Sequence, residues 1–305
     1  MHKKGQMFTL IVIVLIGLLF ISFEIFSIAQ ERNTVKNRIS SMETMMFSIE
    51  KNMERQMYIS GFRTTFLAEQ QITNTGQYIN VDHFFNEAFF NGSVSGSNTS
   101  IMAGATYSDI IASINQKAAK INVVIALSDP HVIINQEDPW NIKYSLISNF
   151  TLEDKSNLAR WNKQQIVSAY IPITGFEDPI YIVNTNALIS RKINKTLYQG
   201  AYVNGEDVSN LAAHLSNGYY AANPIAPSFL NRLAGNMSAD INGIESFVDL
   251  NKLSQQDMET QDKSCVDYIY FSESNPISFG IQGMPSWFRL DDTHLAFYNT
   301  SNLTS

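Results

Sequence analysis

The most distinctive stretch of this chain lies near its start, at residues 7–29, MFTLIVIVLIGLLFISFEIFSIA. Glu24, near the far end, is the only charged residue in it. As an α-helix rising about 1.5 Å per residue, this stretch would be roughly 34 Å long, enough to cross a bilayer core of about 30 Å. Lys3 and Lys4 precede it, and the positive-inside rule places such residues in the cytoplasm. The pattern predicts a basic leader over 1–5 and a single transmembrane helix over 6–29, with the main domain outside the cell.

A cleaved secretory signal peptide is the main alternative to a retained helix. Such a peptide has an apolar region of about 7–15 residues, followed by a small-x-small cleavage site. The apolar run of this chain is longer, and residues 20–24, FISFE, contain no such site. We therefore expect the apolar helix to remain in the protein and to hold it in the cell membrane.

Residues 3–11, KKGQMFTLI, combine a basic pair, a glycine and the start of an unbroken apolar helix. This combination resembles the class III, prepilin-type signal of type IV pilins and pilin-like surface proteins, particularly archaeal ones. The resemblance implies that a prepilin peptidase cuts after Gly5, so that Gln6 becomes the mature N-terminus. It also implies that the retained helix serves as an anchor or a filament core, with the lipid bilayer and sister pilin-like subunits as partners.

One position departs from the pilin pattern. Many pilins carry a glutamate at the fifth mature position, where it pairs with the terminal amine of a neighbouring subunit, but that position here is Leu10. Glu24 lies 18 residues beyond Gln6, about 27 Å along a helix, which is too far to replace it. Because of this departure, the sequence does not predict that the protein assembles into a filament. An uncleaved signal anchor that keeps Met1 is the alternative interpretation.

A long helix is expected to continue beyond the membrane, over 30–75. Between residues 30 and 71 there is no proline and only one glycine, Gly61, where we expect any bend. Apolar side chains recur every three or four residues, as expected for one face of a helix. They are Val35, Ile39, Met42, Met46, Ile49, Met53 and Met57.

This apolar stripe is expected to be buried, either against the outer domain of the same chain or in a seam between subunits. The opposite face, which carries Lys36, Glu43, Glu50 and Glu54, is expected to be exposed. Like charges stand one turn apart at Glu50 and Glu54, so pairs within the helix contribute little. Tertiary or quaternary contacts must therefore stabilise it.

The rest of the chain predicts an extracellular antiparallel sheet with short helices, and the fold class is α+β. Residues 76–106 are expected as a polar loop region, 107–200 as a sheet with one helix, and 201–305 as a C-terminal α+β portion. Between 123 and 173 strand patterns follow each other too closely for parallel crossovers. The expected strands are 123–127, 132–135, 140–150, 165–173, 266–271, 277–281 and 294–298. One short helix is expected to begin near Ser108, and two more are expected over 208–215 and 228–233. The expected turns are Asp129-Pro130, Asp138-Pro139 and Asp178-Pro179.

Composition narrows the class of protein further. The 305 residues are 45% hydrophobic and 16% charged, with 11% aromatic residues, which excludes a largely disordered chain. The net charge of −7 argues against nucleic acid as a partner, because phosphate binding needs a basic surface. With Cys265 as the one cysteine, neither an intramolecular disulfide nor a cysteine-based zinc site is possible.

A search for catalytic and metal-binding motifs predicts no catalytic, cofactor-binding or metal residues. The sequence contains no nucleophile elbow, phosphate loop or zinc-protease motif. His83 and His294 have acids nearby, and an acid–base or metal site could use them, but we expect surface or capping roles. Cys265 is expected as a buried thiol at the start of a strand.

Seven Asn-x-Ser/Thr sequons form a modest excess, and with an outer location they predict glycosylation of some of these asparagines. They are Asn91, Asn98, Asn149, Asn194, Asn236, Asn299 and Asn302. The sequence as a whole favours a membrane-anchored, pilin-like structural or adhesive surface protein that is not an enzyme. The alternative is an uncleaved, signal-anchored extracellular domain that binds a ligand or serves a secretion or sensing system. An extracellular hydrolase is least favoured.

Overall fold

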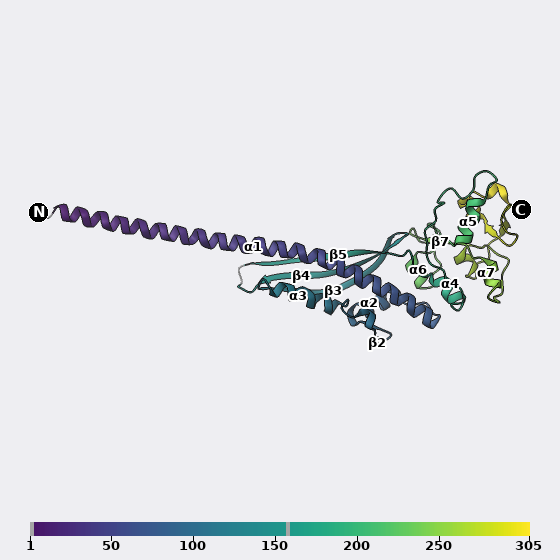
Figure 1. The fold of residues 1–305 in the computed structure, drawn as a ribbon, viewed down its shortest axis with the longest axis horizontal. Coiled ribbons are helices and arrows are strands. Elements are labelled where there is room, and N and C mark those ends of the chain that lie inside the picture. The colour runs from purple at the N-terminus through teal and green to yellow at the C-terminus, as the bar shows by residue number, and fades with distance from the viewer. Residues whose placement is uncertain (1–2, 157–158) are drawn as a thin grey trace. The chain divides into compact units, whose positions relative to one another are not determined.

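A computed structural model describes residues 3–156 and 159–305 of the chain, with side chains from Met7 onward. The fold is α+β, with a long N-terminal helix followed by antiparallel sheets and short helices (Figure 1). The chain forms two compact units. The first comprises Met1–Asn52, Ile111–Asp129 and Asn149–Gln165, and the second comprises Met53–Ile110, Pro130–Ser148 and Ile166–Ser305.

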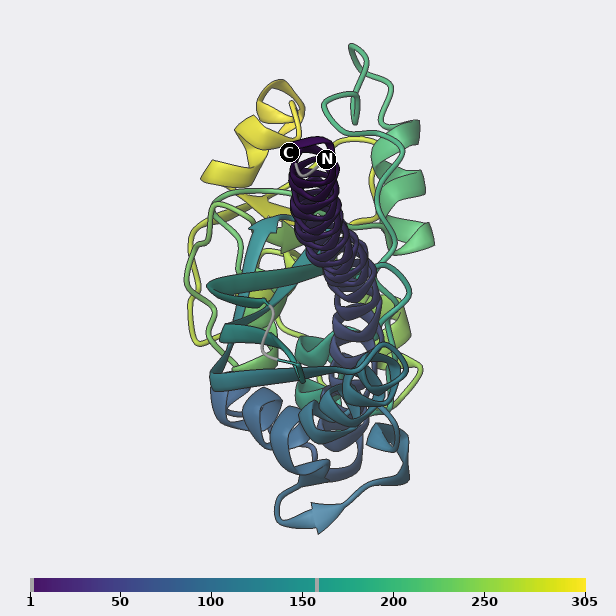
Figure 2. The same ribbon diagram turned by 90° about the vertical axis from the view of Figure 1, so that its left-hand side faces the viewer.

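Helix α1 (Lys3–Thr75) is continuous over 73 residues. At about 1.5 Å per residue, its length is roughly 110 Å. Figure 1 shows this helix from the side and Figure 2 shows it nearly end-on. The predicted continuation of the apolar helix into a long second part is therefore confirmed.

Gly61 lies inside α1 and does not interrupt the helix. A Cβ atom at this position would lie 2.7 Å from Cδ1 of Ile171 and 3.1 Å from the ring of Tyr144. Both distances are shorter than an ordinary carbon–carbon contact. The glycine therefore serves to let the helix backbone approach the side chains of the sheet.

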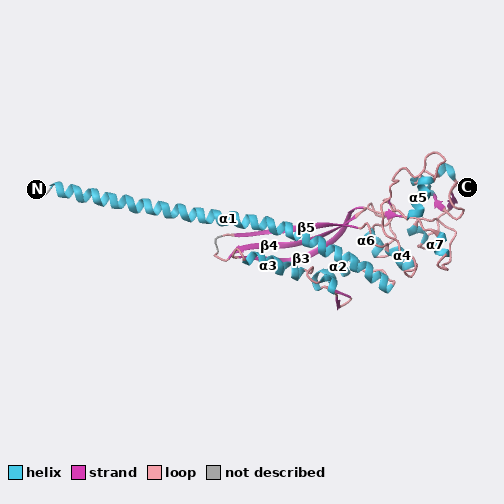
Figure 3. Cartoon of the chain, in the orientation of Figure 1, coloured by secondary structure: helices cyan, strands magenta, loops and turns pink. Residues whose placement is uncertain are grey.

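The elements after α1 are mostly short, and Figure 3 shows how much of the C-terminal part consists of loops. In chain order they are α2 (Val81–Asn91), β1 (Ser93–Val94), β2 (Ser97–Asn98), the 3-10 helix η1 (Ser100–Met102), α3 (Tyr107–Ala119), β3 (Val123–Asp138), β4 (Asn141–Asp154), β5 (Arg160–Pro172), α4 (Pro179–Asn184), α5 (Ser209–Asn217), β6 (Ala221–Ala222), α6 (Phe229–Leu233), β7 (Ile244–Glu245), α7 (Leu250–Ser254), α8 (Asp267–Tyr270), β8 (Ser278–Gly280), β9 (Arg289–Asp291), α9 (Asp292–Phe297) and the 3-10 helix η2 (Ser301–Leu303).

Residues 76–106, expected as a polar loop region, contain helix α2 and the β1–β2 hairpin. Asn80 caps the helix, since its side chain accepts a hydrogen bond from the backbone N–H of His83. The buried residues are Phe84, Phe85, Ala88 and Phe89, at the spacing of one helix face. Both the cap and the spacing are local signals that identify this helix in the sequence.

Strands β3, β4 and β5 form a three-stranded sheet in that order, and the two expected strands 123–127 and 132–135 are both part of β3. Alternate residues of β4 are buried, including Ile142, Tyr144 and Leu146, so one face of this strand carries the core. The predicted turn at Asp129-Pro130 is wrong, because both residues lie inside β3. Asp129 adopts a left-handed conformation there (φ 50°), which an aspartate tolerates.

Two expected C-terminal strands are helices instead. Residues 267–270 form α8, and residues 292–297 form α9, which begins after an Asp291 cap. The apolar run before residue 272 is short and buried, and such a run does not distinguish a strand from a buried helical turn. The expected strand near 277–281 is present as β8, and the expected helices near 208–215 and 228–233 are present as α5 and α6.

Aromatic rings fill the core of the C-terminal part. The ring centroid of Tyr298 lies 4.7 Å from that of Tyr202 and 4.7 Å from that of Phe247, which in turn lies 5.0 Å from Phe288. All four side chains are fully buried or nearly so. These contacts stabilise a region that has little regular secondary structure.

Candidate functional site

The apolar part of α1 is the most unusual surface of the protein. From Met7 to Thr34 every side chain is exposed, with Phe8 at 69% and Phe23 at 71% of full exposure. Soluble proteins rarely expose contiguous apolar patches larger than a few hundred Å². Within the residues that the structure describes, α1 is the one helix that is both long enough and apolar enough to cross a membrane.

The predicted processing and topology residues lie at the beginning of this helix. Lys3, Lys4, Gly5 and Gln6 are part of α1, but their side chains are outside the part of the chain that the structure describes. Their roles stay predictions. Leu10, at the expected fifth mature position, is exposed together with its neighbours.

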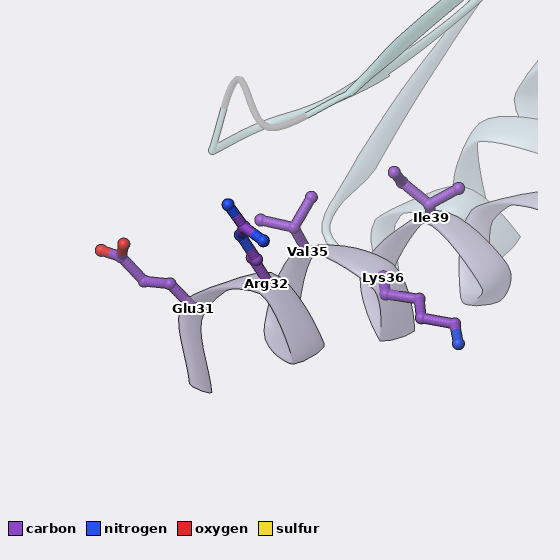
Figure 4. Close-up of a pocket in the computed structure, with 5 residues that line it drawn as sticks. All are labelled: Glu31, Arg32, Val35, Lys36 and Ile39. Atoms are coloured by element: carbon purple, nitrogen blue, oxygen red, sulfur yellow. The ribbon is translucent and has the colours of Figure 1, made fainter. Parts of the chain in front are cut away.

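An open, mostly apolar pocket of about 500 Å³ lies directly after the apolar segment. Its walls include Val35 and Ile39, which lie on the same side of the helix as Arg32, while Lys36 points to the other side (Figure 4). Glu31 also lines the pocket. The helix thus changes here from a mostly apolar surface to one that carries both signs of charge.

Ion pairs hold the next part of α1 against strands β4 and β5 within the first unit. Arg38 donates from Nε to Oδ1 of Asp154 over 2.9 Å, and its Nη2 donates to the carbonyl oxygens of Ile121 and Asn122. Asp154 is fully buried, so this pair is screened far less than a surface pair. Further along the helix, Lys163 Nζ lies 2.5 Å from Oε1 of Glu50. Two charged residues of α1, Arg38 and Glu50, therefore find their partners in the sheet.

The predicted apolar stripe is buried over most of its length. Met42, Ile49, Met53 and Met57 are buried by the chain itself. Val35 and Met46 are half-buried, and Ile39 is 39% exposed, so the start of the stripe differs from the prediction. On the opposite face Lys36, Glu43 and Glu54 are exposed as expected, and Glu50 is half-buried by its ion pair. Packing within the chain accounts for the buried part.

A fully buried ionic cluster occupies the C-terminal part of the second unit. Arg232 donates from Nη1 to Oδ2 of Asp178 at 2.6 Å and to Oδ2 of Asp267 at 3.0 Å. Tyr220 donates to the same Asp178 oxygen at 2.7 Å, and Ser246 donates to Asp267. Each charge has an opposite charge and further hydrogen bonds, which is the condition for a buried ion pair to be tolerated. The cluster joins α6, α8 and the start of α4.

A second buried cluster surrounds His294, which is not at the surface but belongs to the capped first turn of α9, where Asp291 accepts a hydrogen bond from its N–H. Its side chain is 1% exposed, with Nδ1 lying 2.8 Å from both carboxylate oxygens of Asp291 and Nε2 lying 3.1 Å from Oε2 of Glu245. Burial lowers the pKa of His294, but the carboxylates of Glu245 and Asp291 raise it by more, to about 10. Tyr298 donates to Glu245 at 2.7 Å. The imidazolium is therefore a structural charge at neutral pH.

Neither buried cluster was visible in the sequence. Arg232 lies 54 residues from Asp178, and Glu245 lies 49 residues from His294. No local spacing relates such positions. Only the cap of α9 had a local signal, because Asp291 precedes His294 by three residues.

The other residues considered for chemistry are dispersed. Cys265 is buried as expected, although not at a strand start, and burial raises the pKa of its thiol to about 12. Such a thiol remains protonated and is a poor nucleophile. His83 is exposed, 4.0 Å from Glu87. In the described ranges no group of three or more histidine, cysteine or acidic side chains is arranged to hold a metal ion.

Most of the sequon asparagines are exposed. The exposed ones are Asn91, Asn98, Asn194, Asn236, Asn299 and Asn302. Asn149 is half-buried, and its side-chain amide donates to Asp129 at 3.0 Å. Glycosylation stays a prediction, and Asn149 is the least accessible of the seven.

No family model, curated protein or solved structure matches this chain. The functional argument therefore rests on the residues and on their geometry.

Proposed function

We propose that this chain is a membrane-anchored, pilin-like cell-surface protein with a structural or adhesive role. One observation carries the proposal, namely the long apolar surface of α1 over residues 7–29, whose side chains are all exposed and whose one charged residue is Glu24. In water this surface would be costly at about 25 cal/mol per Å², and a bilayer or a bundle of like helices removes that cost. The basic pair and glycine before it support processing of the prepilin type.

In this proposal Lys3 and Lys4 keep the N-terminus in the cytoplasm, and the chain after residue 29 lies outside the cell. The sequon asparagines would then face the glycosylation machinery on the outer side. The lipid bilayer, a prepilin peptidase and sister subunits are the proposed partners. No role for nucleic acid is proposed, because the net charge is −7.

A second candidate function is favoured by Leu10. Without a carboxylate at this position, a neighbouring subunit's amine has no partner inside the apolar helix bundle. The buried stripe residues, such as Met42 and Ile49, already pack within the chain and are not free to form a seam. An uncleaved, signal-anchored extracellular domain, which binds a ligand or serves a secretion or sensing system, uses the same anchor without assembly.

The N-terminus of the mature protein tests which candidate holds. We expect N-terminal sequencing of protein from native membranes, or from a host that has the peptidase, to begin at Gln6. Gly5→Leu should block the cut, because the peptidase needs a small residue there, whereas Gly17→Leu, a control in the same helix, should leave it unchanged. An intact Met1 in the wild-type protein would reject the pilin-like candidate and favour the signal anchor.

A further inference from the structure

The C-terminal end of α1 and the residues directly after it carry four amide side chains that can bind a ligand by hydrogen bonds. They belong to Gln70, Gln71, Asn74 and Gln77. None of these amide groups makes a hydrogen bond within the ranges that the structure describes. Each amide offers two donors and an acceptor, so the four together present a dense set of both kinds.

Two grooves lie along this helix end, next to α2 and the β1–β2 hairpin. The first, of about 310 Å³, runs along Gln77, Tyr78 and Asn80 to α2. The second, of about 370 Å³, runs along Gln70 and Asn74 to strand β2. Gln71 and Ser95 line both grooves, so they form the ridge between them.

The single carboxylate in these grooves is already used by the hairpin. Oε1 of Glu87 accepts hydrogen bonds from Ser93 Oγ at 2.8 Å and from the N–H of Gly96 at 2.7 Å, and Oε2 accepts one from the N–H of Ser95 at 3.2 Å. The bond from Gly96 is the main reason that the pKa of Glu87 is lowered. The hairpin is thus held in place, and the carboxylate is not available to bind a cation.

Tyr78 provides a fixed aromatic wall in the first groove. Its hydroxyl accepts a hydrogen bond from Nδ2 of Asn184 at 3.0 Å, and its ring lies so close to Gly235 that a Cβ there would be 2.4 Å away. The N–H of Ile79 donates to the carbonyl of Leu233 at 3.0 Å, which holds the segment after α1. The wall is therefore preorganised, which reduces the entropy lost when a ligand binds.

We propose that these grooves bind a neutral saccharide. A sugar hydroxyl both donates and accepts hydrogen bonds, as an amide does, and the C–H faces of a sugar ring pack on an aromatic wall. Neither groove is lined by a lysine or an arginine, so an anionic ligand would find no counter-charge except at His83. The inference goes beyond the proposed anchor function and does not rest on it, because it concerns only the second unit.

Two sources can supply the same chemistry, an external glycan or the chain's own N-linked glycan. Asn98 is a sequon asparagine, it is exposed, and it lines the second groove. A glycan attached there would begin inside the groove. The experiment must therefore compare glycosylated and unglycosylated protein.

The test uses the full chain in a zwitterionic detergent without a sugar headgroup. Maltotriose, mannotriose and triacetylchitotriose are titrated calorimetrically into protein from a host that does not glycosylate it. We expect at least one of these probes to bind with a Kd on the order of 1 mM, the weak end of specific binding. Gln71→Ala should weaken binding by about tenfold, since Gln71 serves both grooves, whereas Gln256→Ala, an exposed amide elsewhere, should change nothing.

In the second arm, protein from a glycosylating host is titrated with the same probe. If the glycosylated protein binds the probe more weakly than the unglycosylated protein, and Asn98→Gln restores the binding, the attached glycan is the occupant. If glycosylation leaves the binding unchanged, the occupant is an external saccharide. Both results support the site. The proposal is overturned if no probe binds, if Gln71→Ala binds as tightly as the wild-type protein, or if a sulfated trisaccharide binds more tightly than the neutral ones. Extraction of the protein from membranes is scored separately, so failure of the anchor proposal remains distinguishable.

Discussion

The ion-pair cluster around His294 predicts how the stability of the C-terminal part depends on pH. His294→Gln removes a buried positive charge that lies between Asp291 and Glu245, and it leaves both carboxylates without that partner. Breaking a buried pair in this way costs about 3–5 kcal/mol of unfolding free energy. Glutamine is close to histidine in size and keeps hydrogen-bonding groups, so the change tests the charge more than the packing.

The sign of the pH dependence follows from the direction of the pKa shift. His294 has a pKa of about 10 in the folded protein and about 6.5 when unfolded. A raised pKa gives stability that is fully present below pH 6.5 and is lost as the pH rises towards 10. At about 1.36 kcal/mol per pKa unit the full contribution is roughly 5 kcal/mol, and linkage predicts a loss of about 3 kcal/mol between pH 6 and 9.

Asp291 changes stability at the acidic end. Burial by itself raises the pKa of Asp291, but the hydrogen bond and charge of His294 lower it below its usual value. A lowered pKa gives stability that is present above about pH 4 and is lost as the pH falls through the folded value. The wild-type protein should therefore be most stable between about pH 5 and 6.5, where both groups are charged.

Urea unfolding of a fragment that begins at Gln30, followed by intrinsic fluorescence at pH 6 and pH 9, measures the effect. The fragment lacks residues 7–29 of α1, whose side chains are all exposed, and the residues before them. The difference in unfolding free energy between the wild-type protein and His294→Gln should decrease by about 3 kcal/mol from pH 6 to pH 9. The His83→Gln variant, which is changed at an exposed histidine, should show the same pH dependence as the wild-type protein. If wild type and His294→Gln show parallel pH profiles, the imidazolium assignment is refuted.

Three further predictions concern α1. Gly61→Val should lower the unfolding free energy of the same fragment by about 2–3 kcal/mol in urea, because the added carbons meet Ile171 and Tyr144; Gly17→Val in the full chain, where nothing lies within 4 Å, should leave the urea midpoint unchanged. Met42→Asn should cost about 1–3 kcal/mol, since Met42 is fully buried, and the matched change at Ile39, which is 39% exposed, should cost much less; equal costs would contradict the observed burial. Leu15→Lys together with Ile16→Lys should release the protein from membranes in alkaline carbonate extraction, because each lysine near the centre of a spanning helix costs about 2.5–3.5 kcal/mol, and retention in the pellet would argue against a spanning segment.

Elements with their own periodicity were predictable from the sequence. The long helix through residue 75, α3 with its buried Ile110 and Ile114, and the alternation in β4 follow patterns that span only a few residues. Helix α2 also had local signals in its Asn80 cap and its buried phenylalanines. It was missed because the glycine- and serine-rich hairpin next to it dominated the composition of the segment.

The errors fall where burial on all sides removes periodicity. In α8, Asp267, Tyr268, Ile269 and Tyr270 are all buried, so no alternation of polar and apolar residues distinguishes a helical turn from a strand. Asp267 is charged and buried only because Arg232 lies beside it, and that contact joins positions 35 residues apart. Likewise, Gly61 was interpreted as a weak point of the helix because the sequence does not show the two side chains that pack on it.

The sequence by itself determined that the chain begins with a long apolar helix, that this helix continues as an amphipathic one, and that antiparallel strands and short helices follow. These properties depend on the solvent preference of single side chains and on their spacing along the chain, and both are visible in the sequence. Only the tertiary structure decided that Arg38, His294 and Arg232 are paired, that Gly61 is a packing site, and that the amides at the end of α1 are free beside two grooves. Such properties depend on which distant segments meet, because the energy of a charge, a cavity or an unpaired amide is set by its neighbours in space.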